Sequence, residues 1–210
     1  MTTLLLRQAG TALRALLVAT VVLGLLYPLA VWGVSRLPGL HDRAEGSVLA
    51  APGGVPAGSA LIGIDPVAAD PAADPFFHTR PSASAQDVLG PGDPAVSGGS
   101  NKSGFSDDLR TAVDQRRALI AAREGVDPAL VPADAVTASA SGVDPGISPA
   151  YAALQVPRVA RVTGMPPAGV QALVADATEG RGLGFLGEPA VNVTRLNLAL
   201  AAARAAQGAG

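Results

Sequence analysis

The hydrophobic positions of this chain are continuous near the N-terminus and periodic beyond it. The continuous part is an uncharged apolar run over residues 15–35, with Arg14 before it and Arg36 after it. As a helix that rises about 1.5 Å per residue, this run is about 31 Å long, which matches the hydrocarbon core of a bilayer. Because the run is longer than the apolar core of a cleavable signal peptide, we predict a retained transmembrane helix.

Basic residues at the two ends of the run indicate its orientation. Arg7, Arg14 and the terminal amine precede it without any acid, and two arginines follow it. Cytoplasmic flanks carry the excess of basic residues, so the pattern favours a short cytoplasmic N-terminus over residues 1–14. The remaining residues, 36–210, are then expected to form one extracytoplasmic domain attached by a single pass.

Two residues inside the run are unusual for a simple anchor. Tyr27 lies about 3 Å from the midpoint of the span, which is too deep for an interfacial aromatic side chain. Pro28 frees the carbonyl of Gly24 and is expected to bend the helix. A phenol and a free carbonyl need partners in lipid. We therefore predict that Tyr27 and Pro28 pack against other transmembrane helices, with local water as the alternative.

Beyond the anchor, helical spacing and capping signals predict four helices. Ser106 is a typical N-cap before two acidic residues, and Gly125 is a typical stop. Ser148 and Pro149 open a second helix, and Pro157 is expected to kink or divide it. The predicted helices cover residues 107 to about 124, 149 to 162, 166 to 177 and about 192 to 206.

The predicted extended segments are short and bounded by Gly and Pro. Residues 61–64 are suited to a buried strand, and residues 76–77 to the start of another extended segment. Residues 132–136 are interpreted as a turn or short strand, and residues 180–187 as a glycine-broken extended segment. The segment 53–94 is expected to be mostly loop. Together these elements predict an α+β fold with more helix than strand.

Composition narrows the possible functions. The chain has no Cys, two His and a formal net charge of −2 over 210 residues. The absence of Cys excludes disulfides and thiolate metal sites, and it is ordinary for an extracytoplasmic domain in bacteria. The scarcity of His argues against a zinc site, and the charge argues against nucleic-acid binding. We therefore predict a bacterial inner-membrane protein with no metal site and no nucleic-acid partner.

A hydrolase is the least favoured interpretation of the polar residues. It would use Ser139 or Ser141 as nucleophile with His78 as base, but the chain has no G-x-S-x-G elbow. A lone His in a loop is more often solvated, and the acidic loop 65–74 is expected to be solvated as well. The small-residue loop 137–145 fits either a packed loop or a binding loop, and the packed loop is favoured.

A glycine-rich turn, Ser97-Gly98-Gly99-Ser100-Asn101, precedes Lys102. Such turns cradle phosphate in P-loops. Here, however, Asn101 and Val96 occupy the positions at which a P-loop has glycine. We therefore expect a tight loop whose Ser and Asn side chains bond its own backbone.

Short motifs lie in a characteristic order along nearly the whole chain. They include Tyr27-Pro28, Gly58-Ser59-Ala60-Leu61-Ile62-Gly63, Arg80-Pro81-Ser82-Ala83, Ser97-Gly98-Gly99-Ser100-Asn101, Val136-Thr137-Ala138-Ser139, Gln155-Val156, Leu186-Gly187-Glu188-Pro189 and Leu196-Asn197-Leu198-Ala199-Leu200. Taken in this order, the motifs resemble those of one family, the KdpC family of the bacterial potassium-transporting P-type ATPase. The chain departs from the family pattern at Ile64, after the glycine-rich turn and at Gly146.

The resemblance implies an accessory, non-catalytic subunit of an ATP-driven potassium importer. Its implied partners are a channel-like potassium-binding subunit and a P-type ATPase subunit, whose use of ATP it would promote as a catalytic chaperone. ATP is implied only through this resemblance, with Gln155 as the implied nucleotide contact and no catalytic residue. The candidate partner-interface residues are Tyr27, Pro28, Ser97, Gly98, Gly99, Ser100 and Asn101.

Two views of such a subunit remain open. In one view the chain is a direct nucleotide-binding regulator, which requires the domain to lie inside the cell. In the other view the domain lies outside, over the ion entrance of the channel-like subunit. The basic N-terminal flank favours the second view, in which Gln155 cannot meet cytoplasmic ATP and any effect on nucleotide is indirect.

Overall fold

The computed structural model describes residues 2–51 and 53–208. The chain divides into two compact units, Met1–Ser47 and Val48–Gly210. Each unit is described by itself, beginning with the anchor.

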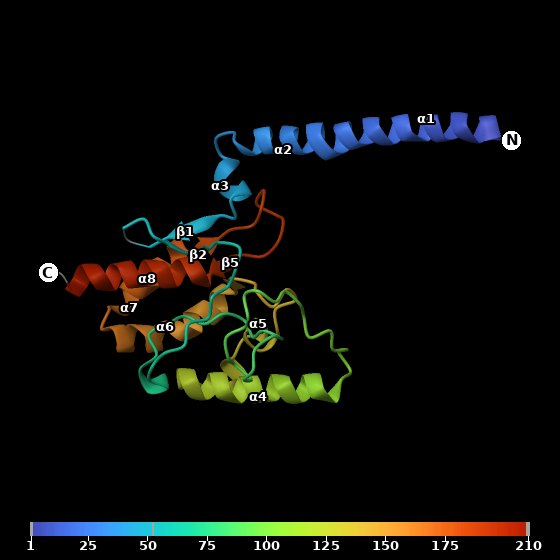
Figure 1. Cartoon of the computed structure of the whole chain (residues 1–210). Coiled ribbons are helices and arrows are strands. Elements are labelled where there is room, and N and C mark those ends of the chain that lie inside the picture. Colours follow the sequence, from blue (N-terminus) through green and yellow to red (C-terminus); the bar gives the residue numbers. More distant parts are fainter. Residues whose placement is uncertain (1, 52, 209–210) are drawn as a thin grey trace. The chain divides into compact units, whose positions relative to one another are not determined.

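The first unit is a long helix followed by a short helical turn (Figure 1). The helix comprises α1 (Thr2–Val21), the π-helical turn η1 (Val22–Leu26) and α2 (Tyr27–Ser35), and α3 (His41–Ala44) follows. It begins before the predicted span, because residues 2–14 are helical as well. Among the described residues, this is the one helix that is long enough and apolar enough to cross a membrane. None of its residues is buried within the chain.

The proline inside the anchor is accommodated by the π-helical turn. The Tyr27 N–H donates to the Val22 carbonyl, five residues back, directly before Pro28. Single π turns of this kind interrupt α-helices without ending them. At the end of the anchor, the Arg36 guanidinium lies 5.2 Å from the centre of the Trp32 ring and 2.8 Å from Glu45 Oε1.

The second unit is an α+β domain, which confirms the predicted fold class. Its strands form two small antiparallel sheets. One pairs β1 (Val48–Ala50) with β2 (Pro56–Ser59). The other has the order β3-β5-β4, with Ile147 opposite Val191 and Thr178 opposite Val191 on the other side. The strands of the second sheet are β3 (Gly146–Ile147), β4 (Thr178–Glu179) and β5 (Ala190–Asn192).

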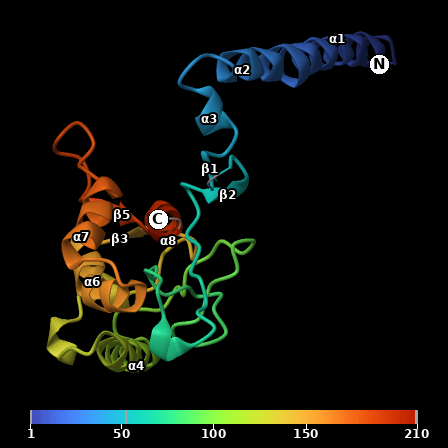
Figure 2. The same ribbon diagram turned by 90° about the vertical axis from the view of Figure 1, so that its left-hand side faces the viewer.

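The helices match the sequence predictions closely because their ends are set locally. Ser106 and Ser148 accept hydrogen bonds from the third residue beyond each, and Gly125 and Gly164 end two helices with positive φ. Helices α6 and α7 pack against each other (Figure 2). The main helices are α4 (Asp107–Glu124), α6 (Pro149–Thr163), α7 (Pro167–Asp176) and α8 (Val193–Gly208), with single turns η2 (Pro71–Ala73), η3 (Pro128–Leu130) and α5 (Ala133–Val136).

Two local predictions were wrong, at residues 61–64 and 180–187, and at residues 132–136 and Pro157 the structure excludes one of two predicted alternatives, the strand and the division of the helix. Residues 61–64 are not a buried strand, because the strand lies earlier, in β2, and Leu61 is exposed. Residues 133–136 form the helical turn α5. Pro157 does not divide α6. Residues 180–187 form a tight loop closed by a Gly182–Leu186 bridge. Short segments without a periodic pattern give no reliable signal for the pairing partner that decides their structure.

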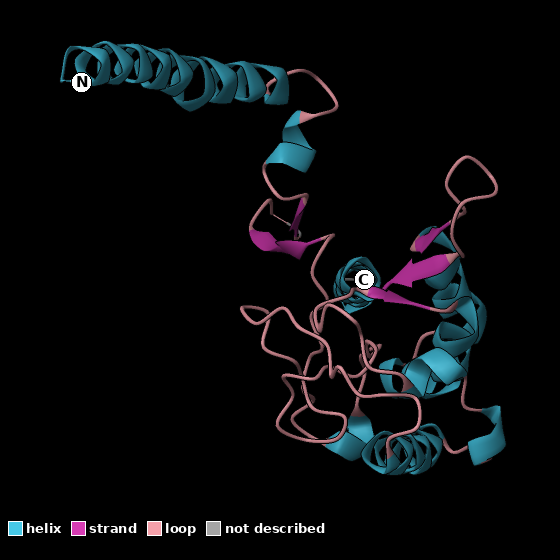
Figure 3. Ribbon diagram, turned by 90° about the vertical axis from the view of Figure 1, so that its right-hand side faces the viewer, coloured by secondary structure: helices cyan, strands magenta, loops and turns pink. Residues whose placement is uncertain are grey.

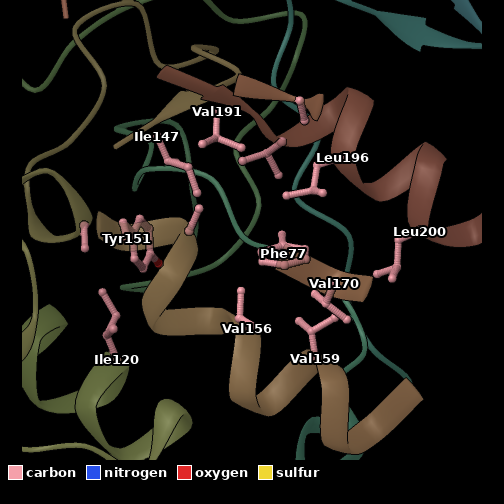
Figure 4. Packing of buried hydrophobic residues seen from close by; sticks show 14 of the residues in the cluster. Phe77, Ile120, Ile147, Tyr151, Val156, Val159, Val170, Val191, Leu196 and Leu200 are labelled. Atoms are coloured by element: carbon pink, nitrogen blue, oxygen red, sulfur yellow. The ribbon is translucent and has the colours of Figure 1, made fainter. Parts of the chain in front are cut away.

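The hydrophobic core lies between the helices and the β3-β5-β4 sheet. Phe77 comes from an irregular segment, yet none of its surface is exposed, and Figure 4 shows it among side chains of α6, α7 and α8. Most of the chain between β2 and α4 is loop (Figure 3). The core therefore buries an extended piece of this loop, and its backbone polar groups must find partners.

Candidate functional site

Two side-chain amides hold the extended segment at Phe77 and His78. From α6, Gln155 Oε1 accepts from the His78 N–H at 2.8 Å, and Gln155 Nε2 donates to the His78 carbonyl at 3.3 Å. From α8, Asn197 Oδ1 accepts from the Phe77 N–H at 2.9 Å, and Asn197 Nδ2 donates to the Phe77 carbonyl at 2.8 Å. The two amides thus supply the pairing that neighbouring strands supply in a sheet.

Gln155 is therefore placed in the interior of the domain. None of its surface is exposed, and Oε1 also accepts from Arg158 Nη2 at 3.2 Å. Every polar atom of the side chain has a protein partner, so in this conformation the amide is not available to a nucleotide. Asn197, its counterpart on α8, was missed because a single polar residue in an apolar helical run gives no sign of a partner 120 residues away.

His78 is buried between two carboxylates, which corrects the prediction of a solvated loop residue. Its Nδ1 lies 2.7 Å from Asp65 Oδ1, and its Nε2 lies 2.5 Å from Asp74 Oδ2. Ionised carboxylates only accept hydrogen bonds, so this geometry fits the doubly protonated imidazolium form of His78. Asp65 and Asp74 face inward at the two ends of the loop 65–74, whereas Asp70 and most of the residues between them are exposed, so the predicted solvated loop holds for its middle and not for its ends.

Neighbouring charged side chains extend the group formed by His78, Asp65 and Asp74 into a buried cluster. Arg158 Nε donates to Glu124 Oε2 at 3.0 Å, and Arg123 Nε donates to Glu124 Oε1 at 2.7 Å. Arg158 Nη1 also donates to the carbonyls of Asp74 and Phe76 at 2.8 and 2.9 Å. The cluster balances three cations against three carboxylates, namely Arg123, Arg158 and His78 against Asp65, Asp74 and Glu124.

Burial and pairing shift the titration of this cluster. Burial opposes the charged form of His78, but the hydrogen bonds to Asp65 and Asp74 outweigh it and raise the pKa of His78 above its ordinary value of 6.5. Burial likewise opposes the charged form of Asp74. The hydrogen bond and charge of His78, the Phe76 N–H and the Arg158 charge outweigh it and lower the pKa of Asp74 below 3.8.

The described geometry does not provide a hydrolytic triad. Both His78 nitrogens are occupied by carboxylates, so no nitrogen is left to accept a proton from a serine. Ser139 is 2% exposed, and its Oγ accepts from the N–H groups of Gly142 and Asp144 at 3.0 and 3.3 Å. In this arrangement His78 is not placed to act as the base that the hydrolase alternative requires.

A groove of about 670 Å³ opens beside the buried cluster. His78, Asp74 and Arg123 reach it, and apolar side chains such as Val67 and Leu119 line its walls. Because the polar groups of His78 and Asp74 are already paired, they offer the groove little unsatisfied hydrogen-bonding capacity. The cluster has the properties of a rigid support for the 74–80 segment.

The glycine-rich turn packs against the small-residue loop 137–145. Gly98 N–H and Ser97 Oγ donate to the Ser141 carbonyl at 2.7 and 3.1 Å. A Cβ at Gly99 would lie 2.8 Å from the Ala140 carbonyl oxygen, so the two backbones touch. The turn was predicted to bond its own backbone, but it bonds the neighbouring loop instead. The loop 137–145 is a packed one, as predicted.

Ser100 and Asn101 make none of these contacts and are exposed, and Asn101 has a positive φ of 51°. Ser97 and Gly98 are also exposed, although they bond the Ser141 carbonyl. The turn is therefore fixed on one side and accessible on the other, which is compatible with its predicted interface role. Tyr27, in the anchor, is 64% exposed within this chain.

In the described residues these features define a class of protein: a membrane-associated chain with one long apolar helix and one α+β domain. The profile of the KdpC family, described as the c chain of K⁺-transporting ATPase, matches residues 9–202. The chain therefore belongs to the KdpC family, and as one component of a larger ATPase it works with partner subunits.

Curated relatives support this assignment along the whole chain. A potassium-transporting ATPase KdpC subunit of Kineococcus radiotolerans is 51% identical over 199 residues, which are 95% of each chain. The KdpC protein of Mycobacterium bovis is 47% identical over 92% of this chain and 97% of its own. That of Streptomyces avermitilis is 45% identical over 92% of this chain and 93% of its own.

Proposed function

We propose that this chain is the accessory, non-catalytic subunit of an ATP-driven potassium importer. Its anchor docks on partner helices with the N-terminus in the cytoplasm. Its domain lies outside the cytoplasm, over the channel-like potassium-binding subunit. In this arrangement the chain stabilises the assembly and promotes ATP use by the ATPase subunit indirectly, through subunits joined across the membrane.

The observation that supports the non-catalytic role is that the polar groups of Gln155 and His78 are buried and already paired. Gln155, the residue that the family resemblance implies as a nucleotide contact, is wholly buried and fully hydrogen-bonded. His78 is locked between two carboxylates. Residues that would hold a nucleotide or carry out hydrolysis need accessible donors or acceptors, so this arrangement favours support of a fold over catalysis.

The docking role is supported by the anchor. None of its side chains is buried within the chain, and it carries a π turn, a tyrosine and a proline near its middle. Polar groups and disturbed backbone in a lipid-spanning helix are tolerated where neighbouring helices satisfy them. The alternative of direct nucleotide binding has no comparable support, since it requires Gln155 to leave the interior.

A photoreactive ATP analogue tests which subunit of the complex binds nucleotide. Membranes opened to both faces make every subunit accessible to the analogue. We expect labelling of the ATPase subunit that excess ATP abolishes, and no ATP-competed labelling of this chain. Labelling of this chain that ATP abolishes and that maps to α6 would contradict the proposal and favour direct nucleotide binding.

A further inference from the structure

The strongest unexplained feature outside the buried cluster is Arg116, on α4. Its Nη1 donates to the Val136 carbonyl at 3.1 Å. Its Nε is the one buried side-chain nitrogen or oxygen that lacks a hydrogen-bond partner among the described residues. Its Nη2 has no acceptor there either. The Nε–Nη2 edge, with which guanidinium groups bind oxyanions in a bidentate manner, is therefore unpaired.

Arg116 also lacks a carboxylate partner in the described residues, although most of the half-buried arginines in this domain have one. Burial alone lowers the pKa of its guanidinium, with no acidic neighbour to offset the effect. A half-buried cation with an orphaned donor is costly for the folded state, because both its charge and its N–H group have lost water. An anion bound to the guanidinium would stabilise its charge, although the Nε atom itself has almost no exposed surface.

The surroundings of Arg116 supply further donors. A pocket of about 480 Å³ is lined by Arg116 and Lys102 and by Gly99 and Ser100 of the glycine-rich turn. The main-chain N–H groups of residues 99–102 donate no hydrogen bond to any described residue. Lys102 Nζ lies 3.3 Å from Asp108 Oδ2 in a largely exposed pair, which competes weakly for the lysine.

We propose that this pocket binds a phosphate group. The residues that line the pocket carry a guanidinium, an ammonium and a hydroxyl, and the turn beside them has unpaired main-chain N–H groups, a donor set suited to phosphate. The glycine-rich turn lacks the P-loop spacing, so the site is built by packing the turn near α4 rather than by one sequence motif. The phosphate is supplied either by a phospholipid headgroup or by free phosphate.

One carboxylate on the pocket wall, that of Asp87, opposes an anion. Its removal gives the proposal a second, opposite test. If phosphate enters this pocket, then Asp87→Asn strengthens binding severalfold, because the repulsion between like charges is lost. An effect of that sign is not expected from damage to the fold.

The experiment uses the full chain in nanodiscs of zwitterionic lipid, titrated calorimetrically with inorganic phosphate at constant ionic strength. We expect saturable binding that Arg116→Gln weakens at least about tenfold, because a charge-assisted hydrogen bond is lost. Lys102→Gln, at an exposed position, weakens it without risk to folding. The matched control is Arg110→Gln on the same helix, whose arginine is exposed and paired with Asp107, and it leaves binding unchanged.

Nanodiscs that contain phosphatidylglycerol distinguish the two sources. If the headgroup is the ligand, these discs raise the melting temperature of the chain without added phosphate, and Arg116→Gln removes that rise. If free phosphate is the ligand, only the titration responds. The absence of saturable binding in both formats, or an equal loss with Arg110→Gln, would overturn the proposal. The proposed subunit role does not depend on this site.

Discussion

At the scale of single residues, the domain depends on polar side chains that replace missing secondary structure. The backbone at Phe77 and His78 has no neighbouring strand, and Gln155 and Asn197 take the place of one. The Gln155 contact spans 77 positions of the sequence, and the Asn197 contact spans 120 positions. The sequence pattern predicted a helix at Gln155, but it held no signal for the partner of its side chain.

Replacement of Gln155 tests this role. Gln155→Ala leaves the His78 N–H and carbonyl buried without partners and opens a cavity, so we expect the free energy of unfolding to fall by about 2–5 kcal/mol. Denaturant unfolding of the full chain in detergent measures this loss. Gln171→Ala, at an exposed position on α7, is the control and is expected to change stability by less than about 0.5 kcal/mol. A loss as small as the control's would show that the amide does not hold the segment.

The shifted pKa values of His78 and Asp74 predict how the stability of the domain depends on pH. Its pKa is raised in the folded state, so its contribution is fully present below 6.5 and is lost as pH rises through the raised value. Asp74 has a lowered pKa, so its contribution is present above 3.8 and is lost as pH falls through the lowered value. The cluster is therefore most stabilising between about pH 4 and pH 6.5.

The measurement is the urea midpoint of the full chain between pH 5 and pH 9, compared with that of His78→Gln. We expect the wild-type midpoint to fall as pH rises above 6.5 and the variant to lack this part of the fall. Each unit by which the folded-state pKa exceeds 6.5 corresponds to about 1.4 kcal/mol. Identical alkaline limbs in the two proteins would show that His78 is not held as an imidazolium.

At the scale of elements, the helices were predictable and the strands were not. Ser106, Gly125 and Ser148 fix helix ends through local hydrogen bonds and a positive φ, so their residue types are sufficient signals. The strands are two to four residues long and exist through pairing with distant segments. The predicted strand at 61–64 was placed a few residues late, because Pro56 and Gly58 in β2 look like turn residues.

The anchor is the element with the most direct link to the proposed assembly. Replacement of both Tyr27 and Pro28 by leucine keeps the helix apolar but removes the phenol and the cause of the backbone irregularity. We expect association with the partner subunits to weaken roughly threefold to thirtyfold, which corresponds to the loss of about 0.6–2 kcal/mol. Quantitative co-purification from detergent measures this effect.

The control for the anchor is Leu16→Val with Leu17→Val, a change of similar extent in the same helix. It leaves the apolar character of the span and the π turn intact, so co-purification is expected to remain at the wild-type level. If the Tyr27 and Pro28 replacements co-purify as well as this control, the two residues have no docking role.

At the scale of the whole molecule, the account depends on which side of the membrane the α+β domain occupies. The chain belongs to a family of K⁺-transporting ATPase subunits. An outer position would place the domain near the ion entrance and remove it from cytoplasmic ATP. An inner position would make direct contact with nucleotide physically possible. The basic residues before the anchor favour the outer position.

Single-cysteine labelling is the most direct test, because the chain has no cysteine of its own. Thr111→Cys on α4 and Gln171→Cys on α7 are exposed reporters for the domain, and Thr3→Cys reports on the N-terminus. With a membrane-impermeant maleimide on spheroplasts, we predict labelling at 111 and 171, and labelling at 3 only after lysis. Labelling at 3 in intact spheroplasts, with 111 and 171 reactive only after lysis, would contradict the account.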